Sequence, residues 1–149
     1  MRTSILVASL GMLLLAGTPA ASPGGAVVLK PDDLKAMGLD TMLSSGESYV
    51  KEMNDLVRGV LNELGSARDG KDFQRMNCLG DVLTTLKGLL RLSEQNAITL
   101  RERVIAKDRT GAEHEFVKLS IARNKVVELH AQDKGCGSGG TEKIGRAHV

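Results

Sequence analysis

The residues with the clearest chemistry in this 149-residue chain are its two cysteines, Cys78 and Cys136. Cysteine thiols form disulfides, bind metals or act as redox pairs, and their spacing discriminates between these uses. The two cysteines are far apart, unlike the Cys-x-x-Cys of a redox pair. No further cysteine or cluster of histidines accompanies them to hold a metal. The pattern favours a structural disulfide, and the metal site and the redox pair are the alternatives.

The histidines His114 and His130 are the next candidates for chemistry. They fall sixteen positions apart on one predicted helix, about 24 Å along its axis, so they cannot share a metal ion. The carboxylates Glu113 and Glu115 flank His114 and could hold a metal or a proton only with a group from another helix, because adjacent helical residues point in different directions. A solvated charged face is the favoured interpretation of this triplet.

Catalytic motifs are missing from the sequence. It contains no His-Glu-x-x-His, no Gly-x-Ser-x-Gly and no glycine loop that precedes a helix to cradle a phosphate. The segment Arg123-Asn124-Lys125 is predicted to be a polar helix face, with Asn124 and Ser93 as polar residues that could set the helix register. We therefore predict no catalytic residue, no metal and no cofactor, and we expect that the protein is not an enzyme.

Three helices must position these side chains. Apolar residues recur at alternating spacings of three and four, which predicts amphipathic helices over residues 45–64, 73–106 and 111–134. Ser44-Ser45-Gly46-Glu47 and Thr110-Gly111-Ala112-Glu113 match capping boxes, and Gly65 and Gly135 are expected helix ends. The apolar positions are Val50, Met53, Val57, Val60 and Leu64; then Met76, Leu79, Leu83, Leu86, Leu90, Ala97, Leu100 and Val104, interrupted by Ser93; then Leu119, Ala122, Val126 and Leu129.

The second and third predicted helices form a hairpin, because the connection between them is too short for any but an antiparallel arrangement. Its centre lies near residue 109, about 31 residues after Cys78 and about 27 before Cys136, so both cysteines reach the same end. A disulfide there closes a loop of about 59 residues and contributes about 4 kcal/mol in the chain-entropy estimate. The predicted fold is all-α: an antiparallel three-helix, coiled-coil-like bundle with a long disulfide-clamped hairpin.

The N-terminus has the pattern of an export signal. Arg2 precedes an apolar stretch of about a dozen residues, too short for a typical bilayer span, and Thr18-Pro19-Ala20 offers a cleavage site. Residues 1–20 are therefore predicted to be a signal peptide, and an uncleaved anchor is the alternative. A lipoprotein is excluded because Thr18 stands where the acylated cysteine is needed. We expect a periplasmic or secreted protein with no stable membrane anchor after cleavage.

The rest of the chain divides into three parts. Residues 21–43 are predicted to be a flexible leader with a possible short helix that opens at Pro31 and ends at Gly38, and residues 44–136 form the helical domain. Residues 137–149 are predicted to be a flexible tail. Residues 143–149 can be encoded by AAGATCGGAAGAGCACACGTC, which contains a widely used sequencing adapter, so we interpret them as an artefact and the gene as truncated.

Composition and charge exclude several functions. Aromatic residues make up only 2% and tryptophan is absent, which argues against stacking platforms for sugars or single-stranded nucleic acid. The chain has 20 basic and 18 acidic residues. Removal of the predicted signal peptide and of residues 143–149 takes away Arg2, Lys143 and Arg146, which leaves 17 basic residues. The predicted native charge is therefore −1, and nothing favours nucleic acid as a partner.

The helical hairpin, with Cys78 near its start and Cys136 at its end, resembles a domain of uncharacterised exported proteins of myxobacteria and their relatives. The resemblance covers about residues 75–138 and rests on the segments Arg75-Met76-Asn77-Cys78-Leu79, Leu86-Lys87-Gly88-Leu89-Leu90, Glu113-His114-Glu115-Phe116-Val117-Lys118, Ala122-Arg123-Asn124-Lys125-Val126 and Cys136-Gly137. It implies export and a helical hairpin, and it transfers no active site.

The function expected from the sequence is that of an exported, non-enzymatic structural or protein-interaction module. Its helix faces would bind a protein partner or a second copy of the chain. The alternative is a periplasmic helical domain that senses a ligand or a metal.

Overall fold

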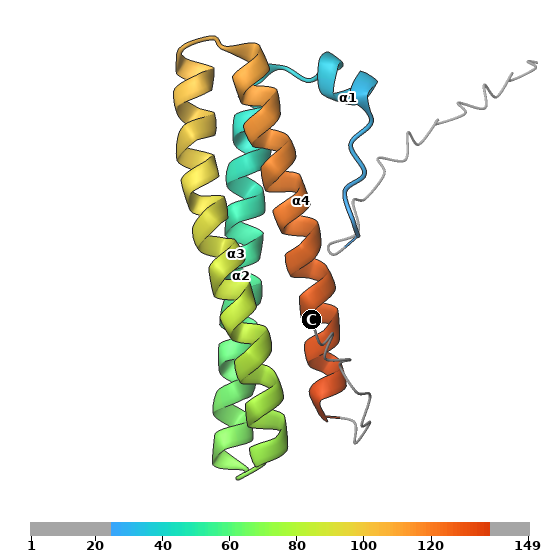
Figure 1. The fold of residues 1–149 in the computed structure, drawn as a ribbon, viewed down its shortest axis with the longest axis vertical. Coiled ribbons are helices and arrows are strands. Elements are labelled where there is room, and N and C mark those ends of the chain that lie inside the picture. Colours follow the sequence, from blue (N-terminus) through green and yellow to red (C-terminus); the bar gives the residue numbers. More distant parts are fainter. Residues whose placement is uncertain (1–24, 138–149) are drawn as a thin grey trace, which may run out of the picture.

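A computed structural model describes residues 25–137, and the predicted signal peptide and adapter-encoded residues lie outside this range. It contains four α-helices and a closing 3₁₀ turn, and no strand occurs between residues 25 and 137. The elements are α1 (Pro31–Ala36), α2 (Leu39–Asp69), α3 (Phe73–Ile105), α4 (Arg109–Asp133) and η1 (Lys134–Gly137). The three long helices lie side by side and alternate in direction, with α1 beside the start of α4 (Figure 1). The predicted all-α, antiparallel three-helix bundle is confirmed.

The two loops that join the long helices repeat one motif. In each, a lysine with positive φ ends one helix (Lys71, φ 54°, and Lys107, φ 56°), and the aspartate after it caps the next. The amide of each aspartate donates to a carbonyl five residues back (2.9 Å), which is the Schellman helix ending. The carboxylates of Asp72 and Asp108 accept from the amide three residues ahead, at 3.0 Å in both cases. Such tight loops force neighbouring helices to be antiparallel.

The ends of α2 correct the sequence prediction most strongly. A start at residue 45 was predicted, but α2 begins at Leu39, and the expected capping box at Ser44–Glu47 lies within the helix. A β-carbon on Gly46 would stand 2.8 Å from Leu100 Cδ2 and 3.0 Å from Leu119 Cδ1. This glycine therefore allows the three helices to approach closely, and it is not part of a cap. The helix also continues through Gly65 to Asp69, and the Schellman loop that starts at Gly70 and Lys71 ends it.

The other predicted boundaries agree more closely. Helix α3 ends one residue before the predicted 106, whereas α4 begins two residues before the predicted 111 and ends one before 134. The second expected capping box is wrong, since Asp108 and not Thr110 caps α4. The short helix opening at Pro31 is present, and it ends at Ala36 before the predicted stop at Gly38. Residues 39–43, assigned by the sequence to the leader, are the first turn of α2.

The core consists of two apolar clusters stacked along the bundle. None of the residues on the predicted apolar seams is exposed, so the periodicity identified the buried face correctly. The cluster toward the disulfide end contains Met53, Val57, Val60, Ala67, Leu79, Leu83, Leu86 and Val126. The cluster toward the α3–α4 loop contains Met42, Leu100, Ala112, Phe116 and Leu119.

A polar layer separates the two clusters. Ser93 on α3 and Ser120 on α4 are buried, and each hydroxyl donates to the carbonyl four residues back on its own helix (2.9 and 3.0 Å). Tyr49 on α2 and Arg123 on α4 lie at the same level, with the guanidinium carbon 5.8 Å from the ring centre. This layer brings the charged side chain of Arg123 into the bundle between the two apolar clusters.

Candidate functional site

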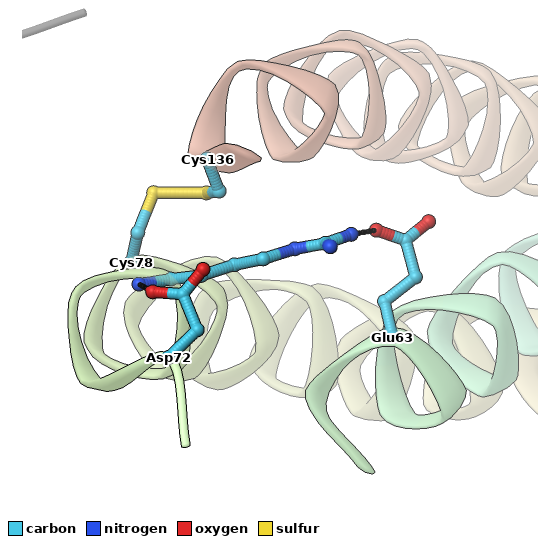
Figure 2. The surroundings of a disulfide bond; sticks show 5 residues. Glu63, Asp72, Cys78 and Cys136 are labelled. Carbon is cyan, nitrogen blue, oxygen red and sulfur yellow. Dashed lines mark hydrogen bonds and ion pairs between the residues drawn. A yellow bond between two sulfur atoms is a disulfide. The ribbon is translucent and has the colours of Figure 1, made fainter. Parts of the chain in front are cut away.

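The disulfide predicted from the sequence is present. Cys78 near the start of α3 is joined to Cys136 in η1, with the two Cα atoms 5.7 Å apart (Figure 2). Close beside it, Arg75 donates to Glu63 of α2 at 3.0 Å. Covalent and ionic links therefore tie all three long helices together at this end of the bundle.

A histidine–aspartate pair lies on the last turn of α4. His130 Nδ1 is 2.6 Å from Asp133 Oδ2, and Asp133 is fully buried. Its second oxygen, Oδ1, has no hydrogen-bond partner among the described residues. Burial raises the pKa of Asp133, and the neighbouring His130 opposes that increase, while Glu63 adds to it. The aspartate fixes the orientation of the imidazole ring.

The ring of His130 lines a groove between α2 and α4. The groove has a volume of about 570 Å³, which is in the range of sites that bind small molecules or peptide side chains. Its lining combines apolar and charged side chains: Ser48, Lys51, Glu52, Asp55, Leu56, Val127, His130, Ala131 and Lys134. Leu56 and Val127 are half-buried, whereas Lys51 and Lys134 are exposed. The groove therefore has an apolar floor and a charged rim.

A buried arginine is paired with Glu52, one of the residues that line this groove. Arg123 is only 5% exposed, and it forms a two-pronged ion pair with Glu52 (Nε to Oε2, 2.8 Å; Nη2 to Oε1, 2.7 Å). Its hydrogen bonds to Glu52 raise the pKa of the guanidinium further above its usual value. Tyr49 lies against it, and burial raises the pKa of the Tyr49 phenol. These contacts hold Arg123 rigidly, which leaves its third nitrogen, Nη1, to donate to the carbonyl of Gly25.

The segment before α1 is bound along α4. The side-chain oxygen of Asn124 accepts from the amide of Val27, and its side-chain nitrogen donates to the carbonyl of the same residue, each at 2.8 Å. The sequence predicted a flexible leader with a possible short helix, but the part before that helix is bound to α4. Asn124, which was expected to set the helix register, instead supplies two hydrogen bonds to the extended backbone.

The histidine triplet from the sequence does not form a site. His114 is exposed, while Glu113 pairs with Arg109 (2.8 Å) and Glu115 with Lys118 (2.6 Å) on the same helix. No group of three or more His, Cys, Asp or Glu side chains within residues 25–137 could hold a metal ion. His114 and Glu113 thus belong to a charged helix face, as was favoured from the sequence, whereas Glu115 is buried and only 8% exposed.

Sequence reasoning missed the burial of Arg123, the backbone-binding role of Asn124 and the pairing of His130 with Asp133. The i, i+3 spacing of His130 and Asp133 was a usable signal, because residues three apart share a helix face. Arg123 offered no such signal, since its partner Glu52 is 71 positions away in the chain.

Comparison with protein-family models, with curated proteins and with solved structures finds no match to this chain. The resemblance to exported hairpin proteins remains a prediction. Across residues 25–137, the structure has no helix that is both long enough and apolar enough to cross a membrane.

Proposed function

We propose that the protein is an exported, non-enzymatic interaction module that binds a helix of a partner protein in the groove between α2 and α4. The observation that carries this proposal is the groove itself, with Leu56, Val127 and Ala131 among its lining residues. An amphipathic helix laid into such a groove buries its apolar face on the floor. Its own charges would face Lys51 and Lys134 on the rim.

The disulfide supports the exported location. Disulfides form and persist in oxidising compartments such as the periplasm or the extracellular space, and they are rare in the cytosol. The Cys78–Cys136 bond is compatible with such a compartment, as is the predicted signal peptide.

Site-specific photo-crosslinking in the exporting host tests this proposal. A photoreactive residue at Ala131, in the groove, should give one discrete adduct, whereas the same residue at Thr84, exposed on α3, should give none. Placing Arg at Ala131 blocks the groove, so A131R should not compete for the adduct, whereas A131S should compete as the wild-type protein does. Identical adducts from both positions, or none from Ala131, would contradict the proposal.

A small ligand in the same groove is the second candidate, and the His130–Asp133 pair favours it. A buried carboxylate that orients a histidine is a common device for presenting a ring nitrogen to a ligand. Thermal melts in Zn²⁺ and in a panel of small anions would show stabilisation that H130A removes and H114A retains. If no compound raises the melting temperature of the wild-type protein, this candidate fails.

A further inference from the structure

We propose that the surface of α4 that holds residues 25–38 is an exchangeable peptide-binding site, and that it accepts the same segment from a second copy of the chain. We call residues 25–38 the N-terminal arm. This site differs from the α2–α4 groove, so the proposal stands independently of the function proposed above.

The polar contacts between α4 and the arm go to the arm's backbone. Asn124 forms two hydrogen bonds with Val27, and Arg123 donates to the Gly25 carbonyl. At the other end of the arm, Arg109 donates to the last carbonyls of α1, those of Leu34, Lys35 and Met37 (3.1, 2.6 and 3.0 Å). Backbone recognition requires an extended segment followed by a helical turn, whichever chain provides them.

The arm also contributes apolar side chains at regular positions. Leu29, Leu34 and Met37 pack against the core cluster at the α3–α4 loop, whereas Val28 points outward and is 79% exposed. In the extended part, Val27 and Leu29 are half-buried, whereas Ala26, Val28 and Lys30 are exposed. This alternation is that of a strand with one face bound. A second copy carries the same pattern.

The binding surface on α4 is held in place without help from the arm. Arg123 is fixed by Glu52 and by the ring of Tyr49, all of which belong to the long helices. A departing arm would leave buried donors of Arg123 without partners, and an incoming arm would satisfy them again. A surface organised in advance loses little entropy when it binds.

The arm is joined to the bundle by a simple hinge. Only Met37 and Gly38 separate α1 from α2, and both have extended backbones (ψ 131° and 155°). The Met37 amide closes the last turn of α1 by donating to the Asp33 carbonyl (3.1 Å), and the Gly38 carbonyl accepts from Met42 in the first turn of α2 (3.0 Å). Rotation about ψ of Met37 and φ of Gly38, which lie between these two groups, leaves both helix ends intact. Exchange of identical arms reproduces every contact in a two-fold dimer, and it is a low-cost route to self-association.

A labelled synthetic peptide of residues 25–38, added to the full mature chain, tests the site. V27P removes the amide that Asn124 binds and should loosen the chain's own arm, so V27P should bind the peptide saturably. Adding N124A should weaken that binding by about tenfold or more, because two hydrogen bonds are lost. K125A, an exposed neighbour on α4, should leave it unchanged, and a peptide N-methylated at Val27 should not bind.

Light scattering then tests the second copy. The wild-type chain should form a concentration-dependent dimer that excess peptide dissociates, and V27P should form less of it. L29A, which removes an apolar contact of the chain's own arm and leaves the α4 surface intact, serves as the second loosened variant if V27P fails to fold by circular dichroism. Failure of the peptide to bind either folded variant overturns the site, as does binding that N124A does not weaken. A chain that stays monomeric at all concentrations while the peptide binds overturns exchange between copies.

Discussion

The two ends of the bundle are stabilised by different kinds of interaction. At the disulfide end, a covalent bond and the Arg75–Glu63 ion pair surround a fully buried carboxylate, Asp133. At the α3–α4 loop end, an apolar cluster around Phe116 is covered by α1. An unpaired carboxylate oxygen in a buried position costs free energy. The disulfide end can tolerate this cost because a covalent bond holds it together, whereas the loop end depends on packing and on non-covalent polar contacts such as those of Arg109.

Removing the disulfide should have the largest effect. The double variant C78S/C136S is expected to lose about 4 kcal/mol of unfolding free energy, because the unfolded chain regains the freedom of the closed loop. Urea melts of the oxidised and reduced wild-type protein and of the variant measure this loss. Reduced wild-type protein should match the variant. If the variant is as stable as the oxidised protein, the disulfide does not stabilise this end, and packing does.

Truncation in the loop-end cluster should come next. Leu100 is fully buried, so L100A is expected to cost about 3 kcal/mol from lost burial and the remaining cavity. Because Leu100 and the disulfide lie in different parts of the bundle, the cost should be the same with and without reductant, within about 0.5 kcal/mol. A cost that changes more than this on reduction would show that the two ends are coupled.

Substitutions at two glycines, Gly46 and Gly88, should change the stability by an intermediate amount. Alanine at Gly46 would meet Leu100 and Leu119, so G46A should lose about 1–2 kcal/mol from overpacking despite better helix propensity. Alanine at Gly88 meets nothing within 4 Å, so G88A should gain about 1 kcal/mol. Thermal melts of the two variants measure the difference. Equal gains from both would mean that Gly46 is not a site of close helix approach.

The two Schellman loops should respond alike. Lys71 and Lys107 both have positive φ, which costs an L-residue free energy that glycine does not pay. K71G and K107G should each stabilise the protein by up to about 1 kcal/mol, as measured by urea denaturation. A gain at only one loop would identify an end at which the lysine side chain itself contributes.

The smallest effect concerns pH. Burial raises the pKa of Asp133, so folding favours the protonated form. This contribution is complete below the unfolded pKa of about 4 and is lost as the pH rises through the folded pKa. The stability of the wild-type protein relative to D133N should therefore fall as the pH rises above about 4.

Asp55 provides a control with the opposite sign. Hydrogen bonds from Lys51 and then Arg58 lower the pKa of this surface carboxyl. The stability of the wild-type protein relative to D55N should therefore fall as the pH drops toward the folded pKa. Urea melts from pH 3 to pH 8 follow both variants. The same slope for D133N and D55N would contradict the assignment of a raised pKa to Asp133.

Much of the architecture could be predicted because helix and hairpin signals are local. The three-and-four spacing depends only on the helical period, so the seam residues from Val50 to Leu129 were located correctly. The hairpin placed Cys78 and Cys136 at one end because residue counts along antiparallel helices fix their levels.

The start of α2 was missed for a physical reason. A capping box at Ser44–Glu47 stabilises a helix start by a modest free energy, and helix packing around Gly46 outweighs it. The ends of α2 therefore depend on neighbours that are remote in sequence. The same holds for Arg123, whose role depends on Glu52 and Gly25.

The sequence by itself determined the helices, their antiparallel order and the cysteine pairing, because periodicity, loop length and residue counts act along the chain. Only the tertiary structure decided where the charges are buried, how the arm is bound and where the α2–α4 groove opens. Those features arise from side chains on different helices, such as Asn124 and Val27, whose contact no local pattern encodes.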